Sequence, residues 1–195
     1  MKKLFLVVIA VIVCSATESL AGSLTVTRPI QGGRWGNQSP SAHPKYVANT
    51  QYAVDVLVPM NQGTVHPVRW STYTMAGYDD GFKATVVDVL PTCSDNGAGT
   101  TVILRVYNSQ NVWVGEMAYS HLDNVQVSKW QTFNWYAIPL LGYTKRWPSS
   151  SCYFVNDDNA VHVHMEWGAR SPYASSTYGY NAYQTIDFGM GAISR

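Results

Sequence analysis

Two histidines separated by one residue, His162 and His164, stand in the apolar segment 160–167. Side chains of an extended strand alternate between its two faces, so residues at i and i+2 point the same way. One imidazole of such a pair can hold a metal ion while the other handles protons beside it. The plainer alternative is a strand whose exposed face carries two imidazoles without chemistry, since no helical HExxH motif accompanies the pair.

Four further segments carry polar or glycine residues in a recognisable order along the chain. They are Arg34-Trp35-Gly36, Tyr52-Ala53-Val54-Asp55, Gly63-Thr64 and Ala118-Tyr119-Ser120-His121-Leu122-Asp123, followed by Val161-His162-Val163-His164-Met165-Glu166. With these segments the chain resembles the lysostaphin-type (LytM-like) zinc endopeptidase family, whose pattern is HxxxD, a glycine-threonine turn, a tyrosine-x-His-Leu segment and a terminal His-x-His-hydrophobic-Glu strand. The resemblance covers most of residues 34–167, and the two histidine motifs are specific in combination.

The resemblance implies a role for each matching position. Asp55 and His164 correspond to ligands of one zinc ion, and His121 and His162 to the two histidines that flank the reacting water without binding the metal. Zinc polarises a scissile carbonyl and lowers the pKa of its bound water. A neutral imidazole can then accept the proton, and a second can stabilise the oxyanion or protonate the leaving amine.

The chain departs from the family pattern at one metal ligand. Gln51 stands four residues before Asp55, where the family has histidine, and an amide oxygen is a weak donor to zinc. Three readings stay open. Gln51 coordinates weakly, or His43 or His66 substitutes for the missing ligand, or the site holds no metal and the fold serves binding. His43 lies in a loop-like stretch and His66 in an apolar edge segment, where either ring also fits a role without metal.

The beginning of the chain has the pattern of an export signal. Lys2 and Lys3 precede an apolar run over residues 4–13, and residues 19 and 21 are small, which predicts a signal peptide over residues 1–21. We therefore expect a secreted or periplasmic protein without an integral membrane anchor. Cys93 and Cys152 are the cysteines outside this segment, and an oxidising compartment favours a disulfide between them over two separate buried thiols.

The charge balance excludes one class of partner. Two of the 13 basic and one of the 12 acidic side chains lie in the predicted signal peptide, so the numbers in residues 22–195 balance. A polyanion-binding protein carries a basic excess, so we expect no nucleic acid partner. The resemblance instead implies a peptide or peptidoglycan-like substrate.

The composition predicts strands rather than helices. Tyrosine, tryptophan, valine and threonine are frequent, and glycine, proline and asparagine break the chain often. We predict one all-β, mainly antiparallel domain over residues 22–195, with a motif-bearing core at 34–167 and an aromatic, polar C-terminal extension at 168–195. The predicted strands are 52–58, 83–90, 100–107, 112–120, 135–141 and 160–167, with a hairpin joining the third to the fourth.

Aromatic and acidic residues outside the motifs remain ambiguous. Tyr143, Trp147 and Tyr153 lie in a stretch that is longer than in the family and are candidates for gripping a substrate peptide, or for packing over the sheet. Asp123 either orients His121 or forms a turn. Glu166 either supports an imidazole or ends an edge strand. The acidic run 156–159 lacks the spacing of a calcium loop and reads as a turn.

Three function classes follow from these patterns. The first is a secreted zinc endopeptidase that cuts glycine-rich or cross-bridge peptides. The second is a non-catalytic binding protein or hydrolase activator on the same fold. The third is a β-sandwich lectin, for which Asp55, His121 and His162 are expected to lie far apart.

Overall fold

The computed structural model describes a strand framework and the turns around it. The described residues are 24–26, 29–36, 52–59, 62–70, 72–73, 82–93, 98–107, 111, 113–134, 137–148, 150, 152, 161–168 and 186–187. This part of the chain forms twelve strands and contains no helix, which confirms the all-β, mainly antiparallel fold. Within it there is also no helix with the length and apolar character needed to cross a membrane.

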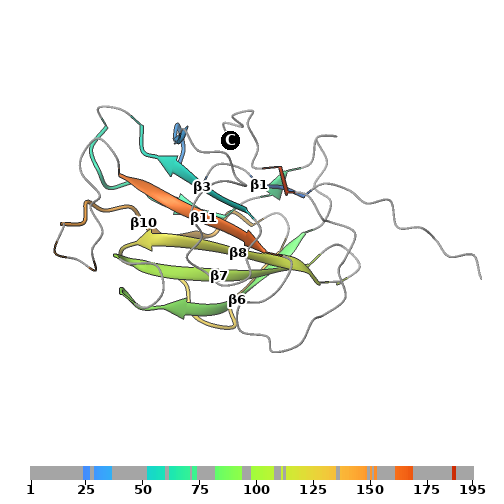
Figure 1. The fold of residues 1–195 in the computed structure, drawn as a ribbon. Helices are drawn as coiled ribbons and strands as arrows, with labels where there is room; N and C mark the ends of the chain where they lie inside the picture. Colours follow the sequence, from blue (N-terminus) through green and yellow to red (C-terminus); the bar gives the residue numbers. More distant parts are fainter. Residues whose placement is uncertain are drawn as a thin grey trace, which may run out of the picture.

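A seven-stranded sheet in the order β2-β3-β11-β8-β7-β6-β9 forms the body of the structure. All its strand pairs are antiparallel. The long strands β3, β11, β8, β7 and β6 lie side by side in this order in Figure 1. The bounds are β2 Arg34–Trp35, β3 Tyr52–Leu57, β11 His162–Gly168, β8 Trp113–Leu122, β7 Thr100–Tyr107, β6 Lys83–Leu90 and β9 Thr132–Phe133.

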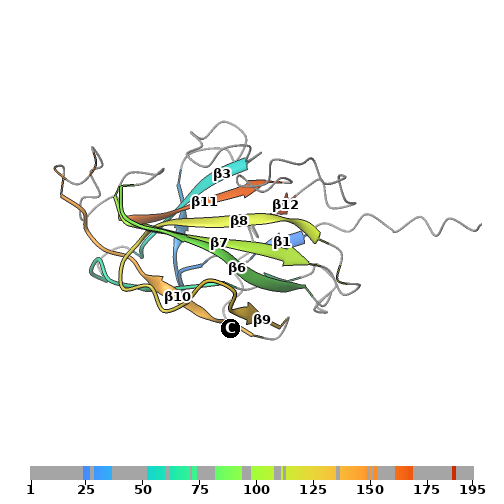
Figure 2. The same cartoon turned by 90° about the horizontal axis from the view of Figure 1, so that it is seen from below.

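Two small sheets accompany the large one. β4 (Pro67–Arg69) pairs with β10 (Leu140–Tyr143), and β1 (Leu24–Val26) lies between β5 (Thr72–Tyr73) and β12 (Ile186–Asp187). The β1–β12 pair is parallel, unlike every other pair in the described residues. Figure 2 shows β9 and β10 along the lower side of the long strands.

Five of the six strands predicted from the sequence are confirmed, with ends that differ by at most two residues. The hairpin is confirmed by the antiparallel pairing of β7 with β8. The strand predicted at 135–141 is wrong, because only its last two residues join β10. Ala137 instead donates its N–H to the carbonyl of Asn134 in a turn, and Pro139 has no N–H to give to a ladder. The strands that sequence patterns missed have two to four residues, too few to show a period.

The large sheet has one apolar face and one mixed face. On β11 the alternation sends Val163, Met165 and Trp167 into the main hydrophobic core, which also contains Val68 of β4 and Leu141 of β10. The small β4–β10 sheet therefore covers the apolar face. The opposite face carries His162, His164 and Glu166, beside a second, smaller cluster of Val87, Ile103 and Ala118.

Several sequence expectations fall on residues outside those that the structure describes. These are the signal peptide 1–21, the acidic run 156–159, most of the extension 168–195, and the site candidates Gln51, His43 and Tyr153.

Candidate metal and proton-transfer site

The pairing of β3 with β11 brings the aspartate of the first motif beside the histidine pair of the last. In this antiparallel register His164 lies directly opposite Asp55, and His162 lies opposite Leu57. Directly opposed residues of an antiparallel pair share one face with Cβ atoms about 5 Å apart. The sheet register alone therefore places an early carboxylate against the imidazoles of a late strand.

The side-chain distances define a compact cluster. Nδ1 of His164 lies 2.9 Å from Oδ1 of Asp55, and Nε2 of His162 lies 3.5 Å from the same oxygen. The ring of His121 lies 5.0 Å from that of His162 and 6.0 Å from that of His164, centroid to centroid. Three imidazoles and one carboxylate thus share one site.

Glu166 completes the cluster on its buried side. Nε2 of His164 lies 2.9 Å from Oε1 of Glu166, whose side chain has no exposed surface. This position was ambiguous in the sequence, and the structure shows it to be the support of an imidazole rather than a charged residue at a strand edge. Histidines that bind metals commonly use their second ring nitrogen in this way.

His164 therefore lies between two carboxylates, which raise its affinity for a proton. A neutral imidazole carries one N–H, yet both nitrogens face a carboxylate oxygen at hydrogen-bonding distance. Burial lowers the pKa of His164, but the hydrogen bonds and charges of Asp55 and Glu166 outweigh this effect and raise it. The arrangement suits an imidazolium, or a neutral ring that keeps its proton toward Glu166 and directs the Nδ1 lone pair at a cation shared with Asp55.

A β-bulge brings His121 into the same cluster. Thr100 pairs with Leu122 and Val102 pairs with Tyr119, so β8 has one residue more than β7 between these pairs. His121 takes a left-handed backbone conformation there, with φ of 67°. In a regular strand its side chain would follow Tyr119 to the core face, whereas the bulge turns it toward His162 and His164. A hydrogen bond between the hydroxyls of Thr101 and Ser120, 2.9 Å long, spans the bulge.

Neighbouring residues hold His121 at three points. Its Nδ1–H donates to the carbonyl of Ala98 at 2.8 Å, and its own carbonyl accepts from the indole N–H of Trp147 at 3.4 Å. A Cβ on Gly99 would come within 2.5 Å of the Cα of His121, so only glycine allows this approach. The bond to Ala98 fixes the tautomer and leaves Nε2 as the proton-accepting nitrogen.

The environment keeps the ring of His121 neutral. Burial, and then the nearby His162, lower the pKa of His121 to about 3 against the smaller opposing effect of the bond to Ala98. The ring is therefore uncharged at neutral pH and carries its single proton on Nδ1. A proton that it accepts must be passed on quickly, because the site disfavours its charged form.

The lowered pKa of His121 predicts an acid-sensitive fold. The unfolded chain binds a proton to this residue below about pH 6.5 and the folded chain does not, so the stability that His121 contributes is complete above that pH and falls as the pH approaches 3. We expect a loss of about 3 kcal/mol by pH 4. His164 acts with the opposite sign: its pKa is raised, so its contribution is complete at low pH and is lost as the pH rises through the folded-state value.

Urea unfolding of the native chain and of His121→Asn between pH 7 and pH 4 separates the two effects. Asparagine tolerates the left-handed backbone and retains an amide donor, but does not titrate. The native chain should lose more stability than the variant as the pH falls. A difference between the two that stays constant over this range contradicts the prediction.

His66 and Asp123, which the sequence also suggested for the site, bond to residues other than those of the histidine cluster. The ring of His66 donates to the carbonyl of Gly63 at 3.2 Å, and its backbone N–H donates to the hydroxyl of Thr144. Asp123 pairs through its backbone with Tyr143 and through its carboxylate with Lys145 at 3.5 Å. Asp123 thus fixes the β10 strand rather than the ring of His121. Trp147 does reach His121, but by way of the backbone carbonyl.

The donor set fits a metal ion in part. Two donors of one tetrahedral zinc lie about 3.4 Å apart, so Oδ1 of Asp55 and Nδ1 of His164 need to separate by only a few tenths of an ångström to accept it. Among the described residues, however, no group of three His, Cys, Asp or Glu side chains has the arrangement of a complete metal site.

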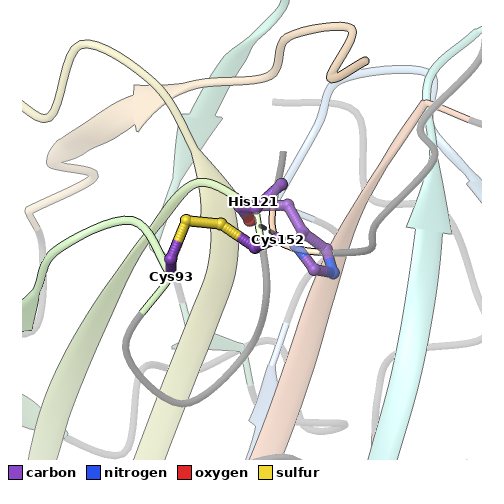
Figure 3. The surroundings of a disulfide bond; sticks show 4 residues. Cys93, His121 and Cys152 are labelled. Carbon is purple, nitrogen blue, oxygen red and sulfur yellow. Dashed lines mark hydrogen bonds between the residues drawn. A yellow bond between two sulfur atoms is a disulfide. The ribbon is translucent and has the colours of Figure 1, made fainter. Parts of the chain in front are cut away.

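The predicted disulfide between Cys93 and Cys152 is confirmed. The two Cα atoms lie 5.4 Å apart, within the usual range of such bridges. Figure 3 shows the bridge next to His121. A disulfide is compatible with an oxidising, extracellular location.

Sequence reasoning missed the supports of His121. Ala98 acts through its backbone carbonyl, which no residue type reveals. Gly99 was visible as a glycine directly before a strand, and such a glycine often marks a close backbone approach.

Comparison of the chain with protein-family models, with curated proteins and with solved structures finds no match.

Proposed function

We propose that this protein is a secreted metal-dependent peptidase of the lysostaphin (LytM-like) type, acting on glycine-rich or cross-bridge peptides of the peptidoglycan kind. The observation that carries the proposal is the meeting of Asp55, His162 and His164 with His121 from a separate strand. The lectin alternative expects these residues far apart, and their distances disfavour it. The disulfide supports the extracellular part of the proposal.

The residues have distinct parts in the proposed reaction. Asp55 and Nδ1 of His164 would hold the zinc ion, and Glu166 orients His164 by accepting its Nε2–H. Zinc, when bound, polarises the scissile carbonyl and activates water. Nε2 of His121 accepts the proton, since Nδ1 is committed to Ala98. His162, the more exposed of the strand pair, donates to the developing oxyanion or to the leaving amine.

The amide at position 51 of the proposed ligand set supports a second candidate function, which is binding without catalysis. Gln51 stands where the resemblance expects a histidine, so a chain that holds metal poorly would bind peptide or activate another hydrolase without catalysis. The two candidates differ in one measurable property, which is retention of zinc by the native protein.

Zinc titration of the purified protein, read by competition with a chromophoric chelator, decides between them. The peptidase proposal expects about one zinc per chain and cleavage of a pentaglycine-containing peptide that stops on chelation. Gln51→His should then tighten zinc binding by about 100-fold, because imidazole replaces an amide oxygen. Gln131→His is the matched control, since Gln131 lies at the opposite edge of the sheet beside β9 and should leave the affinity unchanged.

Two outcomes contradict the peptidase proposal. A native protein that binds no zinc but gains it with Gln51→His has a disarmed site and favours the binding function. A protein that binds no zinc with either residue has no metal centre at Asp55 and His164. Replacement of His43 by alanine in the native chain shows whether that histidine supplies the third ligand.

A further inference from the structure

The two cysteines of the disulfide lie close in the sequence to the two residues that hold His121 by hydrogen bonds. Cys93 precedes Ala98, whose carbonyl accepts the Nδ1–H of His121, by five residues. Cys152 follows Trp147, whose indole N–H donates to the carbonyl of His121, by five residues. The bridge therefore joins the two chain segments that supply these contacts, and Figure 3 shows it beside His121.

His121 needs such support more than an ordinary strand residue does. It is fully buried, it lies at a bulge, and its left-handed backbone conformation is unfavourable for a non-glycine residue. Such a conformation persists only when contacts from the surrounding structure hold it in place. Ala98 lies just before β7 and Trp147 lies in the segment after β10, and among the described residues no strand pair joins these two supports.

We propose that the Cys93–Cys152 disulfide is a positioning device for His121, which keeps the Ala98 and Trp147 supports closed on this residue. The proposal concerns regulation of the site and rests on the proposed function only for its effect on turnover. The positioning itself is independent of whether the protein binds zinc or cleaves a peptide. Breaking the bridge releases the ring of His121 while Asp55, His164 and Glu166 stay joined by the β3–β11 register.

The test measures hydrogen exchange of the Nδ1–H of His121 in the full chain labelled with 15N-histidine. One variant replaces both cysteines by serine. A second keeps the bridge but inserts Gly-Ser-Gly after Pro148, which slackens the tether and barely changes the loop length that the disulfide closes. The control carries the same insertion after Ser109, between β7 and β8, whose Tyr107–Trp113 pair lies at the end of the two strands away from His121.

Both variants should exchange this proton at least tenfold faster than the native chain and the control. The indole N–H of Trp70, buried in the main core, should exchange at the native rate in all of them and so reports intact folding. Where zinc and cleavage are present, kcat should fall while zinc affinity stays the same, because His121 is not a ligand.

If the serine variant does not fold, the insertion variant alone tests whether the disulfide positions His121. Exchange of the His121 proton within twofold of native in a folded insertion variant overturns the proposal. Failure of the native protein to bind zinc or cleave peptide overturns the proposed function and leaves this result unaffected, so the two are distinguishable.

Discussion

Replacing His164 by alanine is expected to remove zinc binding and to destabilise the fold at the same time. The imidazole supplies one of two described donors, so its loss should weaken zinc affinity by more than about 100-fold, beyond the usual effect of changing a residue that only supports a ligand. It also takes the imidazole away from Glu166, a carboxylate with no exposed surface. Separating a buried ionic pair typically costs about 3 kcal/mol or more.

His162→Ala is the matched control for this prediction. His162 lies on the same face of the same strand, keeps some solvent contact and does not support Glu166. Its removal should leave stability within about 1 kcal/mol of native, as for most partly exposed sites, and should lower turnover without lowering zinc affinity. Zinc competition and urea unfolding on the three proteins measure both effects. Equal losses of affinity in the two variants would mean that His162 is itself a ligand.

Gly99→Ala is the second change with a large expected effect. The methyl group would meet backbone atoms of His121 and Leu122, at 2.5 Å from the Cα of His121, and backbone cannot move aside as a flexible side chain can. The positive φ of 85° adds its own cost for alanine. Strain of about 2 kcal/mol from the backbone and a similar cost from overpacking give a loss of about 4 kcal/mol.

Gly63→Ala separates these two causes. Gly63 has nearly the same φ, 81°, but a Cβ built there has no heavy atom within 4 Å. This variant should lose only about 1–2 kcal/mol, which is the backbone term alone. Urea unfolding measures the difference in stability between the two variants, and the indole signal of Trp147 reports whether the bulge at His121 has moved. Equal losses in the two variants would show that contact with His121 does not limit the choice of residue at position 99.

The fold was largely predictable because long strands carry their own signal. Residues 83–90 and 100–107 alternate or run apolar over eight positions, enough to show the period of a strand. The segment 135–141 fails for the opposite reason, since Pro139 and a local turn at Ala137 prevent pairing despite its apolar composition. The two-residue strands β2 and β9 form only because longer neighbours offer them a ladder.

The sequence revealed which chemical groups the site contains, but not which of them contact one another. The spacing of His162, His164 and Glu166 placed all three on one strand face, because side chains alternate along any strand. The partnership of Asp55 with His164 depends on the β3–β11 register, which links residues 109 positions apart. Only the folded chain decides such a register.

The position of His121 was decided by tertiary structure alone. By alternation it belongs on the core face with Tyr119, and one extra residue in β8 moves it to the other side of the sheet. That bulge depends on Gly99, on the carbonyl of Ala98 and on the indole of Trp147, which come from other segments of the chain. The sequence suggested that Cys93 and Cys152 pair, but it did not suggest that this disulfide acts near His121. Residue types determined which groups are present, and packing between segments far apart in the chain determined which of them meet.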